Sequence, residues 1–148
     1  MLDSTNRRLL DELHRDPRMT MSELGRRVGM SSPAVTERVQ RMERAGVIRG
    51  YRLDVDPAAI GLPVAAWVRI RPGPGQLTKL TALISDSPTV SEGHRISGED
   101  CLLVKVHAPT IEDLEDVLDR FLHFGQTVTS IVVSSPVPPR HLPVGPAD

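Results

Sequence analysis

The chain has 148 residues, of which 39% are hydrophobic and 25% charged, a composition that suits one soluble domain or two small ones and excludes a disordered or membrane-embedded chain. Its net charge of −1 is the sum of two unequal parts: residues 1–52 hold 11 arginines and 7 acidic residues (net +4), and residues 53–148 hold 7 basic and 12 acidic residues (net −5). This asymmetry predicts a nucleic-acid-binding part joined to a part with another role.

Further counts narrow the class of protein. The single cysteine, Cys101, excludes an internal disulfide, the N-terminus has no signal-peptide pattern, and no apolar run reaches the roughly 20 residues that span a bilayer. We therefore expect a cytoplasmic protein that does not bind a membrane. Only four aromatic residues are present, which favours double-stranded over single-stranded nucleic acid because unpaired bases are bound by stacking on rings. The five histidines have no metal-ligand spacing and no catalytic motif is recognisable, so we expect no metal, no cofactor and no enzyme activity.

Two short helices are predicted before residue 30. Asp3 or Ser4 is expected to cap the first helix. The second begins at Thr20, whose hydroxyl and the Glu23 carboxylate have the spacing of a capping box, and it ends at Gly29. The apolar side chains at helical spacing that we expect to be buried are Leu9, Leu10, Leu13, Met21, Leu24 and Val28.

A third helix is predicted after a tight turn, with Ser32 as its cap and Pro33 at its first position. The order helix, glycine-containing turn, helix is that of a helix-turn-helix, in which Gly25 lets the two helices cross closely. The exposed side of the third helix carries groups that bind phosphates or read base edges, namely Thr36, Glu37, Arg38, Gln40, Arg41 and Arg44. We therefore predict that this helix enters the major groove of DNA.

The remaining chain has a different pattern. Residues 47–53 alternate enough to predict a short wing or a linking strand. Strands are then expected over residues 64–70, 89–96, 101–106 and 128–133, with helices starting near Leu77 and after Thr110. The fold class is therefore α+β, with an N-terminal (winged) helix-turn-helix domain and a C-terminal ferredoxin-like βαββαβ domain. We place the helix-turn-helix domain at residues 1–52, a linker at 53–62, the second domain at 63–136 and a flexible tail at 137–148.

Helices on one face of the predicted sheet leave the other face uncovered. We expect this open face to hold Val64, Trp67, Leu102, Val104 and residues such as Val132. Because so small a domain cannot leave an apolar sheet in water, a second copy of the chain is expected to cover it, which predicts an obligate homodimer.

The chain resembles the Lrp/AsnC (feast/famine) transcriptional regulators. The resemblance is carried by the segment Arg38-Val-Gln-Arg-Met-Glu-Arg-Ala-Gly-Val-Ile-Arg-Gly-Tyr51, by the order of the elements, and by Ser97-Gly98 before the third strand. It covers residues 1 to about 136. It implies a cytoplasmic regulator whose first domain binds double-stranded DNA and whose second domain assembles dimers into larger rings, often octamers, with an amino-acid effector bound between dimers.

The resemblance also implies site residues. The positions that face the DNA groove correspond to Ser31, Ser32, Thr36, Glu37, Arg38 and Arg41. The positions of the effector pocket correspond to Gly98, Glu99, Asp100, Gln126, Thr127 and Thr129. Asp100 or Glu99 could accept hydrogen bonds from the ammonium of an amino acid, and Gly98 and Thr127 could donate to its carboxylate. This chain departs from the family pattern at the pocket: it reads Gly98-Glu-Asp-Cys-Leu, whereas many members have one more residue between the glycine and the aspartate.

Two alternatives remain open at this point. Some proteins with the same two-domain layout, the sirohaem decarboxylases, are enzymes that use His and Arg in the second domain, and His94 and Arg95 keep that reading available. A DNA-organising protein without an effector is the other alternative. The enzyme would differ from a regulator by binding a tetrapyrrole. The DNA-organising protein would differ by a DNA affinity that does not respond to amino acids.

Overall fold

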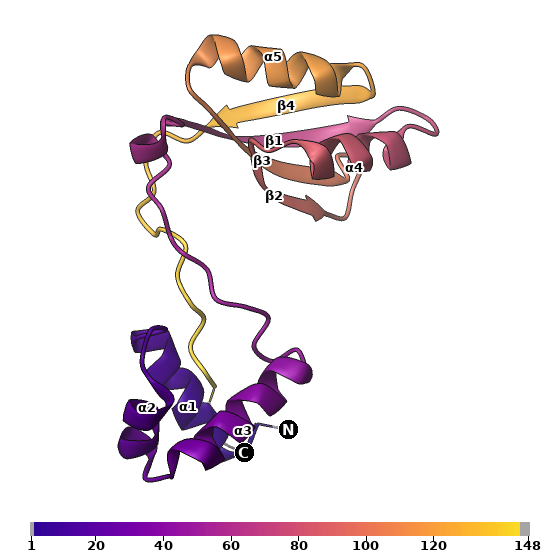
Figure 1. Cartoon of the computed structure of the whole chain (residues 1–148). Helices are drawn as coiled ribbons and strands as arrows, with labels where there is room; N and C mark the ends of the chain where they lie inside the picture. Colours follow the sequence, from indigo (N-terminus) through magenta and orange to yellow (C-terminus); the bar gives the residue numbers. More distant parts are fainter. Residues whose placement is uncertain (1, 146–148) are drawn as a thin grey trace. The chain divides into compact units, whose positions relative to one another are not determined.

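A computed structural model describes residues 2–145 of the chain (Figure 1). The chain divides into two compact units: Met1–Leu53 together with Val137–Asp148, and Asp54–Pro136. Among the described residues, no helix has both the length and the apolar character needed to cross a membrane.

The first unit contains the three predicted helices, α1 (Ser4–Arg15), α2 (Met21–Val28) and α3 (Ser32–Arg44). Asp3 is the N-cap of α1, because its carboxylate accepts a hydrogen bond from the backbone N–H of Asn6 at 2.7 Å. The apolar faces of the three helices meet in one core that comprises Leu9, Leu13, Met19, Leu24, Val28, Val35, Val39 and Met42. The helix-turn-helix is thus built as its apolar spacing predicts.

The caps of α2 and α3 follow the prediction in part. The Thr20 hydroxyl accepts from the N–H of Glu23 at 3.1 Å, but the Glu23 carboxylate is bound by Arg26 and Arg27 and does not close the capping box. Gly29 ends α2 in the left-handed region, with φ of 74°. The N-cap of α3 is Ser31 rather than Ser32, since the helix starts one residue earlier than expected.

Gly25 lies within α2, close to the turn that leads to α3. A Cβ atom added at this position would lie 2.6 Å from the carbonyl oxygen of Met30. The absence of a side chain at Gly25 therefore lets the backbone of the turn approach α2 closely.

The structure shows no strand over residues 47–53, so the wing or linking strand expected there is absent. Its first residues instead close the end of α3, where the N–H groups of Val47 and Ile48 donate to the Met42 carbonyl at 2.9 and 3.2 Å. Ile48 then packs against the helical core. No strand among residues 2–145 pairs with residues 47–53, and an alternating pattern without a partner strand does not make a ladder. A short 3₁₀ helix, Ala58–Ile60, follows.

The second unit is the predicted βαββαβ domain. Its elements are β1 (Val64–Pro72), α4 (Leu77–Asp86), β2 (Val90–Arg95), β3 (Leu102–Ala108), α5 (Ile111–Leu122) and β4 (Gly125–Ile131). The sheet has the antiparallel order β2-β3-β1-β4, as in ferredoxin-like folds (Figure 1). β4 begins three residues before the expected Val128, because Gly125 still pairs with Pro72 and a Cβ there would lie 2.2 Å from the Arg71 carbonyl oxygen.

Both helices cover the same face of the sheet. Their apolar side chains join those of the strands in a core that comprises Ala66, Val68, Ile70, Leu80, Ile84, Leu102, Val104, Val106, Ala108, Leu114, Val117 and Phe121. The prediction for the open face is therefore wrong for Leu102 and Val104, which are buried beneath the helices, and for Val64, which pairs with buried Ala108. Neighbouring residues of a strand point to opposite faces of the sheet. Because Leu102 and Leu103 are both apolar, the sequence of β3 does not show which of them faces the helices.

The open face of the sheet is mixed in character. Trp67 lies there as predicted, and Lys105 Nζ lies 5.5 Å from the centroid of its ring. His107 lies on the same face, with its Nε2 3.1 Å from the Ser91 hydroxyl and its buried Nδ1 without a hydrogen-bond partner. Burial, and then the charge of Lys105, lower the pKa of His107, which keeps the imidazole neutral near pH 7.

Within the first unit, the C-terminal segment contacts α1. The imidazole rings of His14 and His141 stack with their centroids 4.4 Å apart. Arg7 Nη1 donates to the Gly145 carbonyl at 2.6 Å. His141 and Gly145 therefore lie against α1.

Candidate DNA-binding helix and effector loop

The N-terminus of α3 presents polar groups at the surface. Ser31 is exposed, and its side chain makes no capping hydrogen bond, so the hydroxyl is available to a ligand. Ser32 is half-buried, and its carbonyl accepts a hydrogen bond from the Thr36 hydroxyl at 2.8 Å. The Thr36 hydroxyl thus donates within its own helix, and its methyl group is the part that could contact a base.

Arg38 is partly withdrawn from the surface. Its guanidinium Nη1 donates to Asp3 Oδ2 at 2.7 Å and to Asn6 Oδ1 at 3.0 Å, and 31% of its side chain is exposed. The hydrogen bond from Arg38 is the main reason that the pKa of Asp3 lies below its usual range. Arg38 therefore joins α3 to the start of α1, a role that the helix pattern alone did not reveal.

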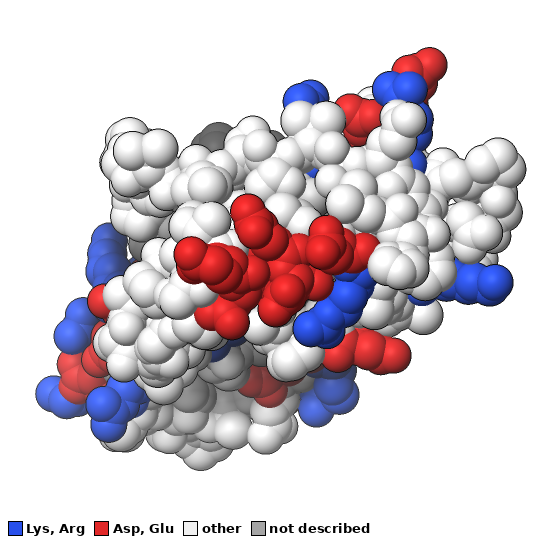
Figure 2. All heavy atoms as spheres, turned by 90° about the horizontal axis from the view of Figure 1, so that it is seen from above, with Lys and Arg blue, Asp and Glu red and all other residues white. Residues whose placement is uncertain are grey.

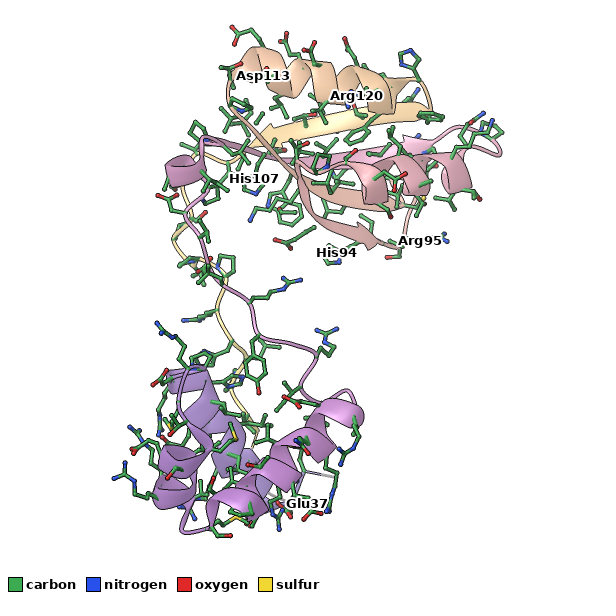
Figure 3. The ribbon with its side chains drawn as sticks, viewed as in Figure 1. Glu37, His94, Arg95, His107, Asp113 and Arg120 are labelled. Carbon is green, nitrogen blue, oxygen red and sulfur yellow. The ribbon has the colours of Figure 1, made fainter. Side chains whose placement is uncertain are left out.

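Glu37 and Arg41 form the exposed ion pair of α3. Arg41 Nη2 lies 2.6 Å from Glu37 Oε1, one helical turn away, and 67% of each side chain is exposed. Figure 3 shows Glu37 on the outer side of the helix. A carboxylate and a guanidinium placed side by side can accept from cytosine N4 and donate to guanine O6 and N7.

The loop before β3 brings two of the predicted effector residues to a cation. Arg71, near the end of β1, lies with Nη2 2.7 Å from Glu99 Oε2 and with Nε 3.2 Å from Asp100 Oδ1. Gly98 adopts φ of 107°, a conformation that side chains disfavour, so glycine suits the turn. Arg71 was not among the sequence-predicted site residues, because nothing in β1 alone links it to a loop 28 residues later.

The three β4 residues of the predicted pocket do not share one face. Gln126 pairs with Arg71 in the ladder and is exposed on the open face, at the same end of the sheet as the loop. Thr127 and Thr129 pair with Ile70 and Val68, so their side chains face α5. The structure of one chain therefore brings together Gly98, Glu99, Asp100 and Gln126, and places the two threonines on the other face.

His94 and Arg95 do not form a catalytic pair. They are neighbours on the edge strand β2 (Figure 3). His94 pairs with Leu103 and Arg95 pairs with Leu102, so by the register their side chains leave opposite faces of the sheet. Glu92 Oε2 lies 3.6 Å from His94 Nε2, which is beyond hydrogen-bond distance. Within residues 2–145, no group of three or more His, Cys, Asp or Glu side chains is placed to hold a metal ion.

The surface of α5 is acidic. Figure 2 looks onto this helix and shows acidic side chains gathered over it. They are the exposed residues Glu112, Asp113, Glu115, Asp116 and Asp119. The negative part of the charge asymmetry is thus concentrated on a helix that repels DNA phosphates.

Both units match described families. Residues 2–49 match the winged helix-turn-helix DNA-binding family, and residues 65–142 match the Lrp/AsnC ligand binding domain. The chain is 35% identical over 133 residues to the HTH-type transcriptional regulator LrpC of Bacillus subtilis, which covers 90% of this chain and 92% of LrpC. The relatives are transcriptional regulators, so the decarboxylase alternative finds no support among them.

Solved structures agree with these matches. The structure of B. subtilis LrpC superposes with a TM-score of 0.86 at 34% identity, over 90% of this chain and 96% of that one. A feast or famine regulatory protein from M. tuberculosis, complexed with L-methionine, gives a TM-score of 0.89 at 32% identity, over 97% and 99% of the two chains. A transcriptional regulator from Neisseria meningitidis in complex with L-Met gives 0.86 at 25% identity, over 95% and 94%.

Proposed function

Because the chain belongs to the Lrp/AsnC family of DNA-binding transcriptional regulators, we propose that it regulates transcription in the cytoplasm by reading specific duplex DNA through α3 in response to an amino acid. The residues proposed to contact DNA are Ser31, Ser32, Thr36, Glu37 and Arg41, with Arg38 acting mainly by holding α3 against α1. The observation that carries the proposal is the exposed Glu37–Arg41 pair on the second helix of a complete helix-turn-helix.

We propose that the working form is at least a homodimer. The support is the open face of the sheet, where half-buried Trp67 and Leu103 and exposed Val128 lie on the side of the sheet opposite α4 and α5. Two copies joined through this face would present two α3 helices, and a dimer of this kind reads half-sites about 34 Å apart in successive major grooves. Assembly of dimers into an octamer, as the family resemblance implies, would let several helix pairs engage DNA.

We further propose that a free amino acid binds at the loop of Gly98, Glu99 and Asp100, beside Gln126. Support comes from the family match over this unit and from the L-methionine complexes of two relatives. Thr127 and Thr129 would reach such a ligand only if a neighbouring subunit presents its own β4 to the loop. An effector bound there changes DNA affinity only as far as it binds one assembly state more tightly than another.

DNA binding is tested by selecting duplexes from a random pool with the full-length protein and titrating the selected duplex at several salt concentrations. Arg41→Ala should weaken binding and lower the slope of log K against log salt by about 0.9, the value for one lost phosphate contact, or should relax base preference if Arg41 reads a base. Arg120→Ala on α5 is the matched control and should bind like the wild type. Failure of the wild type to enrich any duplex would refute the proposal.

The effector is tested separately by thermal denaturation of the wild type with each of the twenty standard amino acids. A ligand of the folded protein raises the melting temperature by mass action. DNA binding that is intact while no amino acid changes either stability or DNA affinity would favour the effector-independent, DNA-organising alternative.

A further inference from the structure

Arg71 is the only basic residue of the described chain that bridges two consecutive carboxylates of the predicted effector loop. Its Nη2 lies 2.7 Å from Glu99 Oε2, and its Nε donates to Asp100 Oδ1 at 3.2 Å. In the sheet it pairs with Gln126 of β4. The guanidinium therefore connects the loop to the central strand β1, and the edge strand β4 places Gln126 beside it at the same end of the sheet.

This bridge is open to solvent and can be exchanged. The exposed fractions of the side chains are 47% for Arg71, 79% for Glu99 and 28% for Asp100. Ion pairs with this exposure contribute little to the stability of a fold, because water and salt compete for both charges. A ligand that supplies equivalent charges can therefore replace them without a large loss of folding free energy.

We propose that Arg71 binds the carboxylate of an α-amino-acid effector, which inserts between Arg71 and Asp100; this inference rests on the proposed effector site at residues 98–100. A zwitterion carries one carboxylate and one ammonium group. Its carboxylate takes the guanidinium in a two-point hydrogen bond, and its ammonium donates to the Asp100 carboxylate that Arg71 releases. Arg71 and Asp100 therefore each have an oppositely charged partner when the ligand is bound.

The exchange also links the ligand to the loop. Without ligand, the loop is held to β1 directly through Arg71. With ligand, the loop is held through the ammonium and Asp100, which moves it by the width of the inserted backbone of the amino acid. The loop position thus reports whether the site is filled, and an adjacent subunit that contacts the loop would experience that change.

The inference makes a chemical prediction about selectivity. A methyl ester of the effector lacks the carboxylate charge and leaves Arg71 without its new partner. An N-acetyl derivative lacks the ammonium and leaves Asp100 without one. Both derivatives should bind the wild type at least about tenfold more weakly than the free amino acid, since each loses a charge-assisted hydrogen bond.

The experiment uses the full-length protein and the amino acid from the panel of twenty that raises the melting temperature most. Its affinity and that of its methyl ester are measured by calorimetry for the wild type, for Arg71→Gln and for the control Arg120→Gln. Arg71→Gln should bind the free acid about tenfold or more weakly and should no longer distinguish acid from ester. Arg120→Gln should retain both the affinity and the tenfold preference.

The outcomes separate this inference from the proposed function. If Arg71→Gln keeps the wild-type preference for acid over ester, Arg71 does not bind the carboxylate, while the effector proposal stands. If no amino acid binds the wild type, the effector proposal and this inference both fail, while DNA binding is judged on its own test. If Arg71→Gln is unstable, the comparison of acid, ester and N-acetyl derivative on the wild type decides: equal binding of all three overturns the exchange.

Discussion

Nη1 of Arg38 lies 2.7 Å from Oδ2 of Asp3, which joins the middle of α3 to the N-cap of α1. Asp3 thereby serves two purposes, since the same carboxylate accepts from the Asn6 N–H through its other oxygen. The pair fixes how α3 sits on α1. It also means that the charge of Arg38 is matched by a carboxylate before any DNA phosphate approaches.

Replacing Asp3 with Asn should therefore strengthen DNA binding. Asparagine keeps the N-cap, because it is as good a cap as aspartate, but it no longer neutralises Arg38 or repels phosphates. We expect a higher affinity for duplex DNA and a salt slope steeper by about 0.9, the value for one additional phosphate contact. Asp11→Asn on the exposed side of α1 is the control. An unchanged slope for Asp3→Asn would show that Arg38 stays away from the backbone of DNA.

The same pair sets a pH dependence. The hydrogen bond from Arg38 lowers the pKa of Asp3 below 3.8, so the folded state favours the ionised carboxylate. The resulting stabilisation is complete above the unfolded-state pKa, and it is lost as the pH falls through the lower folded-state pKa. In Arg38→Gln the pKa of Asp3 should rise toward 3.8. Carbon-13 NMR titration of the Asp3 carboxyl in both proteins measures this, and identical titration curves would contradict the pairing in solution.

Glu37 should limit non-specific binding. Its carboxylate lies 2.6 Å from Arg41 and is exposed. In the proposed complex it would face the groove and repel phosphates unless a cytosine amino group meets it. We expect Glu37→Gln to tighten binding to random duplex by about 1 kcal/mol, roughly fivefold, and to leave binding to the selected site unchanged or weaker. The quantity to measure is the ratio of the two affinities. Glu43→Gln, also on α3, is the control, and equal ratios in both variants would remove Glu37 from specificity.

The parts of the structure that could be predicted are those set by local chemistry. Thr20, Gly29 and the apolar spacing specify a helix-turn-helix, and the alternation of strands and helices specifies the βαββαβ order. Contacts between distant residues could not be predicted in the same way. Arg38 finds Asp3 across 35 positions, and the loop finds Arg71 only because β1 and β3 are neighbours in the sheet. For the same reason, Leu102 and Leu103 were indistinguishable until the register fixed which one faces the helices.

Gly25 should be intolerant of even one methyl group. In Gly25→Ala, the new Cβ would lie 2.6 Å from the Met30 carbonyl oxygen, a backbone atom that can move only with the whole turn. Overpacking of this kind destabilises by about 1–3 kcal/mol, which outweighs the gain of up to about 1 kcal/mol from the better helix propensity of alanine. Urea denaturation should show a net loss for Gly25→Ala. Ser22→Ala, at an exposed position of α2, should show no loss.

The proposed assembly through the open face of the sheet should depend on Trp67. Its indole is half-buried in one chain, under Lys105, and a second copy would bury the rest. Trp67→Glu places a carboxylate in the middle of that face, and burying it there without a partner is unfavourable by several kcal/mol. We expect the variant to sediment as a monomer at concentrations at which the wild type is at least a dimer. Its DNA affinity should fall in parallel, because a monomer presents only one α3 helix to a two-part site.

A matched substitution on the helix-covered side shows whether the effect belongs to this face. Ile111 is a large apolar residue of α5 with 43% exposure, and Ile111→Glu adds the same charge far from the open face. That variant should keep the wild-type sedimentation and DNA affinity. If Trp67→Glu stays assembled, or if both variants dissociate alike, the dimer does not form through the open face, and the half-site spacing expected from it no longer follows.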